Sequence, residues 1–146
     1  IELGLVGSEM CIRDSSKNAD EIAKFLMSHP KVERVSHPSV ASDLAKERAD
    51  KYLSGGCGGL MGFEIKGGIE AGKQFINSLE MFYHVANIGD SRSLAIHPAS
   101  TTHSQLNEEE LLSAGVTPGY VRLSIGLEHL DDIKDDLSQA LDKVSV

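Results

Sequence analysis

The sequence predicts an α/β domain, in which one sheet carries helices on one face. Segments with apolar residues at helical spacing alternate along the chain with short runs that are typical of strands. The 146 residues suit one domain with a single core, and no internal repeat or low-complexity stretch interrupts this order. The spacing alone leaves the relative directions of the strands open.

The first fifteen residues, Ile1–Ser15, differ from the rest of the chain. They begin with apolar residues but have neither a basic region before these nor a small-residue cleavage site, which argues against a signal peptide. The letters GLVGSEMCIRDS resemble translated sequencing-adapter tails. We therefore predict that residues 1–16 are an adapter-like or disordered non-native segment, that the domain occupies residues 17–146, and that the natural chain starts further upstream.

The first elements of the domain follow directly. A helix is predicted over residues 18–27 with Asn18 as its cap, and a short half-buried strand over 32–35. A second helix is predicted over residues 41–53. The residues expected near one face of this second helix are Leu44, Ala45, Arg48 and Tyr52.

A glycine-rich stretch, Ser54–Gly59, separates these elements from the next ones. It does not match a phosphate-binding loop, because no Gly-Lys-Ser/Thr follows and the next segment, 60–66, is a predicted strand. A helix is predicted over residues 69–82. Its inner stripe is expected to consist of Ile69, Gly72, Ile76 and Leu79, continued by Tyr83.

The last elements have the clearest signals. Residues 94–96 form a short apolar run, as in a buried strand, and a short helix over 107–115 begins with the cap Asn107. Residues 121–125 alternate between apolar and polar, which predicts a strand, and residues 130–144 predict an amphipathic helix.

Composition excludes several classes of partner. The net charge of −8 argues against nucleic acid and anionic membranes, and no apolar run approaches the roughly 20 residues that span a bilayer. Cys11 and Cys57 cannot make a disulfide framework, so a reducing cytoplasm is the expected location.

Two stretches carry the candidate site. Ala86–Ser104 gathers hydroxyl and imidazole side chains around a short apolar run, a composition that suits an anionic or zwitterionic ligand. Arg122 lies on the polar side of the last strand, and its guanidinium can bind a carboxylate through two parallel hydrogen bonds. A solvated or salt-bridged strand arginine is the alternative. His97 and His103 lack a third ligand and the usual spacing, so no metal is expected.

The letters ANIGDSRSLAIHPASTTHSQL, read with VRLSIGLE downstream, resemble the C-terminal domain of the Cys/Met-metabolism pyridoxal-phosphate (PLP) enzymes. The likeness runs from about Lys17 to the C-terminus and is greatest with the O-acetylhomoserine sulfhydrylase group. It implies a small, mostly antiparallel sheet with helices packed over it, as in the C-terminal domain of a fold-type I PLP enzyme. It also implies a homo-oligomer, a dimer of dimers.

The resemblance assigns roles to individual residues. It implies that Arg122 binds the substrate α-carboxylate and that Asn87 lies beside the cofactor and that carboxylate. Ser93 and Thr102 match motif letters and are predicted to bind substrate; the alternative is that such hydroxyls bond the loop backbone. His103 also matches a motif letter, and the alternative for it is that its ring bonds a backbone carbonyl oxygen.

The reaction implied is PLP-dependent γ-replacement, which makes homocysteine from O-acetylhomoserine and sulfide. None of the lysines has the Ser/Thr-rich setting of the Schiff-base lysine, so this chain is expected to hold no catalytic residue and to be inactive alone. Enzymes of the cystathionine γ-synthase or methionine γ-lyase type remain alternatives, as does a stand-alone, cofactor-free amino-acid-binding module.

Overall fold

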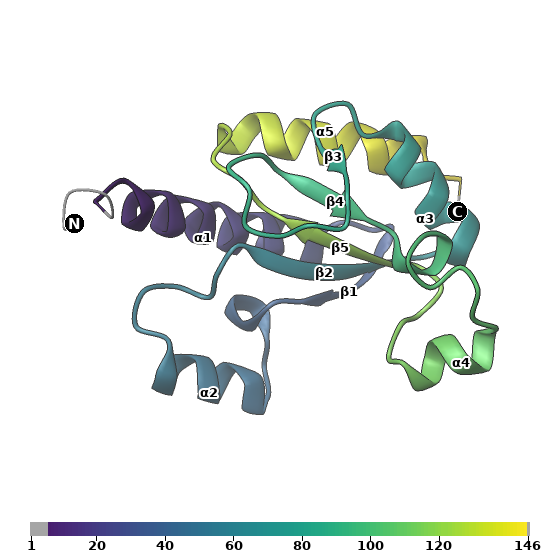
Figure 1. The fold of residues 1–146 in the computed structure, drawn as a ribbon, viewed down its shortest axis with the longest axis horizontal. Helices are drawn as coiled ribbons and strands as arrows, with labels where there is room; N and C mark the ends of the chain where they lie inside the picture. The colour runs from purple at the N-terminus through teal and green to yellow at the C-terminus, as the bar shows by residue number, and fades with distance from the viewer. Residues whose placement is uncertain (1–5, 146) are drawn as a thin grey trace.

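The computed structural model describes residues 6–145, which form one five-stranded sheet with helices around it (Figure 1). The strands are β1 (Val32–Ser36), β2 (Leu60–Ile65), β3 (Tyr83–His84), β4 (Leu94–Ile96) and β5 (Tyr120–Ser124). The helices are α1 (Val6–Met27), α2 (Leu44–Tyr52), α3 (Gly68–Ser78), α4 (Glu108–Ser113) and α5 (Leu130–Lys143), with short 3-10 turns η2 (Pro38–Val40) and η3 (Pro98–Ser100).

The strand order across the sheet is β1-β2-β5-β4-β3. The pairs β1–β2, β2–β5 and β5–β4 are antiparallel, and only the two-residue strand β3 pairs in parallel, with β4. The expected mostly antiparallel sheet is therefore confirmed. Because β3 and β4 point the same way, the chain between them has to travel back along the sheet.

One face of the sheet forms the hydrophobic core. Val121, Leu123 and Ile125 are buried on this face, beside Phe63 of β2. The ring of Phe63 meets that of Phe75 of α3 edge to face at 5.4 Å between centroids. Helices α1, α3 and α5 cover this face, which confirms the predicted layer of helices on one side (Figure 1).

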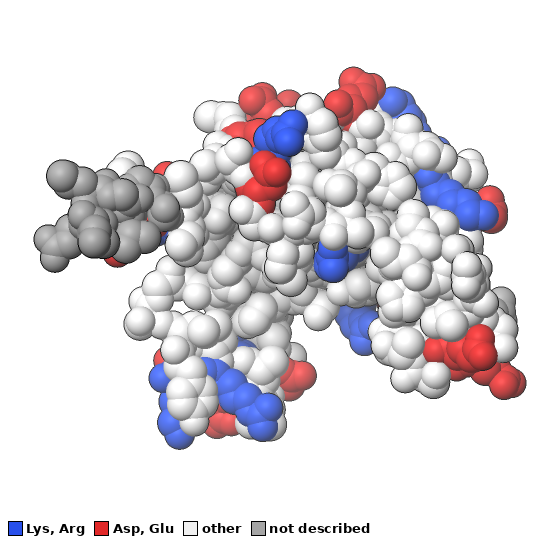
Figure 2. All heavy atoms as spheres, in the orientation of Figure 1, with Lys and Arg blue, Asp and Glu red and all other residues white. Residues whose placement is uncertain are grey.

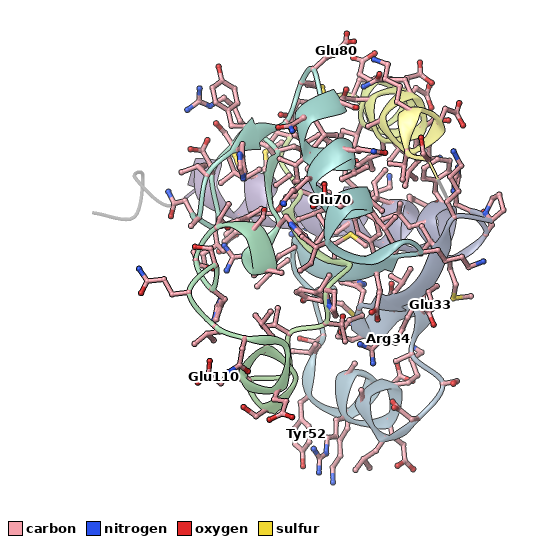
Figure 3. The ribbon with its side chains drawn as sticks, turned by 90° about the vertical axis from the view of Figure 1, so that its right-hand side faces the viewer. Glu33, Arg34, Tyr52, Glu70, Glu80 and Glu110 are labelled. Carbon is pink, nitrogen blue, oxygen red and sulfur yellow. The ribbon has the colours of Figure 1, made fainter. Side chains whose placement is uncertain are left out.

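The opposite face carries the polar members of the same strands, including Glu64 and Arg122. Arg34 of β1 reaches Glu64 at 3.5 Å, and Figure 3 shows Arg34 on the side of β1 toward α2. Helices α2 and α4 project at two corners, with basic and acidic side chains side by side at α2 and acidic ones at α4 (Figures 1 and 2). This face has no helical layer comparable to that of α1, α3 and α5 among the residues the structure describes.

Helix α1 begins earlier than predicted. Asn18 lies inside the helix and is not its cap; its side-chain amide donates to the carbonyls of Gly126 and Glu128 at 3.3 and 3.1 Å. Helical backbone therefore continues through residues 6–16, while residues 1–5 lie outside the described part of the chain. The non-native origin of this segment stays a prediction.

Tertiary packing corrects the predicted face of α2 and part of the predicted stripe of α3. In α2 only Ala49 is buried, so its expected inner residues Leu44 and Tyr52 are exposed, by 54% and 71%. Helix α3 ends at Ser78 rather than at residue 82, and Tyr83 is exposed. The α3 residues that face the core are Ala71, Gly72, Phe75 and Ile76. Within the described part of the chain, Leu44 and Tyr52 of α2 are not covered by another element. The buried face of α3 keeps Gly72 and Ile76 of the predicted stripe and adds Ala71 and Phe75.

Strand β3 was not predicted, whereas β1, β2, β4, β5, α4 and α5 lie within two residues of their predicted bounds. Asn107 caps α4 through a reciprocal pair with Glu110, in which each backbone N–H donates to the other side chain at 2.9 Å. Gly115 closes the helix region with φ of +76°, a conformation that glycine adopts without steric cost. Within the described residues, no helix combines the length and apolar character needed to cross a bilayer.

Candidate substrate-binding site

Strand β5 places Arg122 at the middle of the sheet. It lies in register with Gly62 of β2 and Ile96 of β4, so its backbone is held from both sides. Its neighbours Val121 and Leu123 are fully buried in the core. Because side chains alternate along a strand, Arg122 points to the opposite face, where it is half-buried.

The segment between β3 and β4, residues 85–93, brings Asn87 to this arginine. We call it the crossover loop. The Arg122 Nη2 donates to the carbonyl oxygen of Asn87 at 3.3 Å, and no salt bridge to Arg122 is found among the described residues. A carbonyl oxygen carries no net charge and occupies one of five guanidinium donors, so positive charge and free donors remain for a carboxylate.

The crossover loop is fixed to the end of β5 and the residues after it by hydrogen bonds with the Ser124 hydroxyl and the Leu127 N–H. The Gly89 N–H donates to the Ser124 hydroxyl at 3.1 Å, with Gly89 at φ +72°, and the Leu127 N–H donates to the Ser91 carbonyl at 2.8 Å. The Asp90 carboxylate accepts the Arg92 N–H at 3.0 Å, and this hydrogen bond lowers the pKa of Asp90. These contacts order a loop that exposes the side chain of Asn87.

Ser93 is buried at the end of the crossover loop, where it binds Glu128 and the backbone of Gly126. Its exposed fraction is 0%, and its hydroxyl donates to Glu128 at 2.8 Å while accepting the Gly126 N–H at 2.9 Å. Its own N–H donates to Glu128 at 2.6 Å. Ser93 has its polar atoms engaged and no exposed surface, so it holds the end of the crossover loop, and its role in substrate binding stays a prediction.

Thr102 lies on a separate segment, after the turn η3. Its side chain is exposed, and its hydroxyl pairs with His103 Nδ1 at 2.8 Å. The His103 backbone N–H donates to the Pro98 carbonyl at 2.9 Å. No hydrogen bond in the described part of the chain joins Thr102 to Arg122 or Asn87, so its role in substrate binding stays a prediction.

His97 is a buried structural residue. Its Nε2 lies 2.8 Å from the Pro118 carbonyl, so Nε2 carries the proton, and Nδ1 accepts from the Ser100 hydroxyl at 2.8 Å. Burial lowers the pKa of His97, which keeps the ring neutral. A Cβ on Gly72 would overlap this ring, so the glycine is required there. The described residues include no group of three His, Cys, Asp or Glu suited to a metal ion.

A cavity of about 700 Å³ lies beside the crossover loop. The loop residues Ile88–Ser91 line it together with Ser124, and the first half of α1 contributes Ile12 and Ser15. Sequence reasoning missed the roles of Ser124 and Glu128, although both lie in the VRLSIGLE motif that marks Arg122. Their positions two and six residues after Arg122 are the signal in the sequence from which these roles could have been predicted.

The lysines do not provide a cofactor linkage at this site. Lys31 binds carbonyls at the end of α5, Lys66 donates to the Pro30 carbonyl, and Lys73 pairs with Glu70. Lys24, Lys46 and Lys143 pair with carboxylates on exposed surfaces. Among the described residues, no lysine lines the cavity and none is seen to hydrogen-bond to the crossover loop, so these residues do not fit a role in holding PLP covalently.

The sequence of the chain decides its family. A sequence model of the Cys/Met metabolism PLP-dependent enzymes matches residues 2–142. The chain belongs to this family. The "O-acetyl-L-homoserine sulfhydrylase" of Leptospira meyeri is 55% identical to this chain over 130 residues. The "O-acetyl-L-homoserine sulfhydrylase 1" of Thermus thermophilus is 49% identical over 125 residues.

A crystal structure supports the same relationship at the level of the fold. This Campylobacter jejuni protein, described as an O-acetylhomoserine (thiol)-lyase with a pyridoxyl-lysine monophosphate, superposes with a TM-score of 0.84 and 46% identity over 91% of this chain. The matches cover 88% and 86% of this chain for the Leptospira and Thermus sulfhydrylases. However, the chain spans only 29% and 30% of those two proteins and 32% of the Campylobacter protein. It therefore corresponds to about a third of each.

Proposed function

We propose that this chain is the substrate-side domain of a PLP-dependent enzyme that makes homocysteine from O-acetylhomoserine and sulfide. The chain would hold the α-carboxylate of the amino-acid substrate through Arg122. The observation that carries the proposal is a half-buried guanidinium that is fixed by β5 and Asn87 and has no carboxylate partner among the described residues. The names of the two sulfhydrylases at 55% and 49% identity support the choice of reaction.

The division of labour follows from the residues present. Arg122 would orient the substrate with two parallel hydrogen bonds, and the exposed side chain of Asn87 would lie at the edge of that site. The cofactor, when bound to the whole enzyme, supplies the electron sink for replacement at the γ-carbon. Because no described lysine lies at this site, we propose that the chain alone does not catalyse the reaction. We also propose that the whole enzyme is a cytoplasmic dimer of dimers.

The test compares Arg122→Ala with Arg34→Ala in the gene product that contains this segment. Arg34 is an exposed arginine of the same sheet face and serves as the matched control. Loss of a charged hydrogen-bonding pair should raise the KM for O-acetylhomoserine by about a hundredfold in Arg122→Ala, and leave it within about twofold in Arg34→Ala. An equal KM in both variants would contradict the role of Arg122.

A second function receives support from one relative. The protein named "L-methionine gamma-lyase" from Fusobacterium nucleatum subsp. polymorphum is 42% identical over 97% of this chain. The two functions differ in their products, since a sulfhydrylase forms homocysteine and a γ-lyase cleaves methionine. Measuring homocysteine formation with sulfide alongside methionine breakdown separates them. A monomeric chain that binds amino acids through Arg122 without PLP would instead favour a cofactor-free binding module.

A further inference from the structure

The crossover loop runs along β5 over the open face of the sheet. Its alternate residues meet successive positions of β5 and its continuation: Asn87 meets Arg122, Gly89 meets Ser124, and Ser91 meets Leu127. This direction is the one that the parallel pairing of β3 with β4 demands, because the chain has to return before β4 begins. The position of Asn87 over Arg122 therefore depends on where the loop turns back into β4.

Ser93 lies where the loop turns back into β4, and it is hydrogen-bonded to Glu128, Gly126 and Tyr83. Its N–H and hydroxyl donate to the two carboxylate oxygens of Glu128 at 2.6 and 2.8 Å, and its hydroxyl accepts the Gly126 N–H at 2.9 Å. The Tyr83 N–H of β3 also donates to the Ser93 carbonyl at 3.0 Å. Hydrogen bonds to a carboxylate are shorter and stronger than neutral ones, so this is the firmest attachment of the loop.

Close packing leaves the reversal little freedom. A Cβ on Gly126 would lie 2.5 Å from both the Glu128 carboxylate and the Ser91 carbonyl, so glycine allows the crossover loop to approach the segment after β5 this closely. Asn18 of α1 donates to the carbonyls of Gly126 and Glu128, which fixes the other side of the same backbone. A shift of Ser93 would therefore move the loop relative to β5 and not merely loosen a side chain.

We propose that Glu128, acting through Ser93, is a positioning residue that sets the crossover loop so that Asn87 holds the Arg122 guanidinium ready for a carboxylate. The inference deepens the proposed function and rests on it for the identity of the ligand. Glu128 does not touch the substrate. Its effect reaches Arg122 through the register of the loop, from Ser93 through Ser91 and Gly89 to Asn87.

The test uses isotope-labelled chains carrying Ser93→Ala or Glu128→Gln, with the exposed residues Ser54 and Glu47 changed to Ala and Gln as matched controls. Amide exchange at Gly89 and Leu127 should accelerate at least about tenfold in each site variant, because a hydrogen bond to a charged group is lost. The Arg122 Nε–H signal should shift in the same variants. Amides of the far side of the sheet, such as Ile65, should keep their protection.

A double variant separates positioning from general loss of stability. If Glu128 acts through Ser93, combining both changes should accelerate exchange at Gly89 little more than either change alone. Unchanged exchange at Gly89 and an unchanged Arg122 signal in folded Glu128→Gln would overturn the proposal. So would additive effects of the two changes. Should Ser93→Ala fail to fold, Glu128→Gln alone decides, since glutamine keeps one acceptor for the Ser93 N–H.

Binding of O-acetylhomoserine to the PLP-loaded gene product that contains this segment distinguishes this proposal from the proposed function. If both hold, the wild-type protein binds and the two site variants bind at least about tenfold more weakly. If no variant binds, including the wild type, while the exchange pattern changes as expected, the carboxylate role of Arg122 fails and the positioning role of Glu128 stands. Equal binding by wild type and Glu128→Gln would refute the positioning role.

Discussion

Replacing Asp136 with alanine should destabilise the domain more than any surface change. Asp136 lies on α5 with 7% of its surface exposed. Its carboxylate accepts the backbone N–H groups of Glu80, Met81 and Phe82 at 2.9, 3.0 and 3.3 Å, and the side-chain amide of Gln139 at 3.0 Å. These groups join the end of α3 to the start of β3.

The magnitude follows from the donors that alanine leaves behind. A hydrogen bond to a charged group contributes about 1.5–3 kcal/mol, and a buried donor without a partner costs about 1–3 kcal/mol. The Phe82 N–H is buried, whereas those of Glu80 and Met81 are partly buried and regain some solvation. We therefore expect Asp136→Ala to lower the free energy of unfolding by about 3–4 kcal/mol, which corresponds to roughly 10 °C in Tm.

Urea denaturation followed by circular dichroism measures this difference. Asp135→Ala is the control, because Asp135 directly precedes Asp136 on α5 and is exposed; its change should stay within about 0.5 kcal/mol. A difference between the two variants below about 1 kcal/mol would show that the loop before β3 is not held by this carboxylate, and would refute the reasoning.

Two further predictions concern pH and the end of α5. Burial lowers the pKa of His97 below its ordinary value of 6.5, so the unfolded chain binds a proton that the folded chain does not, and the free energy of unfolding should fall as pH drops below 6.5. Denaturation at a series of pH values checks this; a slope below pH 6.5 as steep in His97→Gln as in the wild type would contradict it. Lys31 donates to the carbonyls of Leu141, Asp142 and Val144 at 2.9, 3.0 and 2.9 Å. Lys31→Met should lower the free energy of unfolding by about 1–2 kcal/mol, whereas the exposed Lys24→Met should change it by less than about 0.5 kcal/mol, and equal values would argue against a helix-end role.

The local signals of the sequence were sufficient for most elements. In β5 the alternation of Val121, Arg122 and Leu123 predicted both the strand and the polar direction of the arginine, because residues two apart share a face. The helical period of α5 predicted its buried stripe, and Asn107 predicted its own role as a cap. Each of these signals depends on contacts within one element or one turn.

Where the prediction failed, a distant part of the chain had decided the outcome. Asn18 was expected to cap a helix, but it lies within α1 and binds the backbone of Gly126, 108 residues away. The end of α3 was placed too late, because the N–H groups of residues 80–82 bind Asp136 instead of continuing the helix. Local pattern contains no information about such partners.

The candidate site divides in the same way. The sequence by itself predicted that Arg122 projects from a strand, and it contains a motif with Asn87 and Ser93 that accompanies the strand in the family it resembles. Only the tertiary structure decided that the Asn87 carbonyl meets Arg122, 35 residues away, and that Ser93 is buried against Glu128. Those pairings depend on the position of β4 between β3 and β5 and on the return path of the crossover loop. Strand order is fixed by long-range packing, which the spacing of residues along the chain does not record.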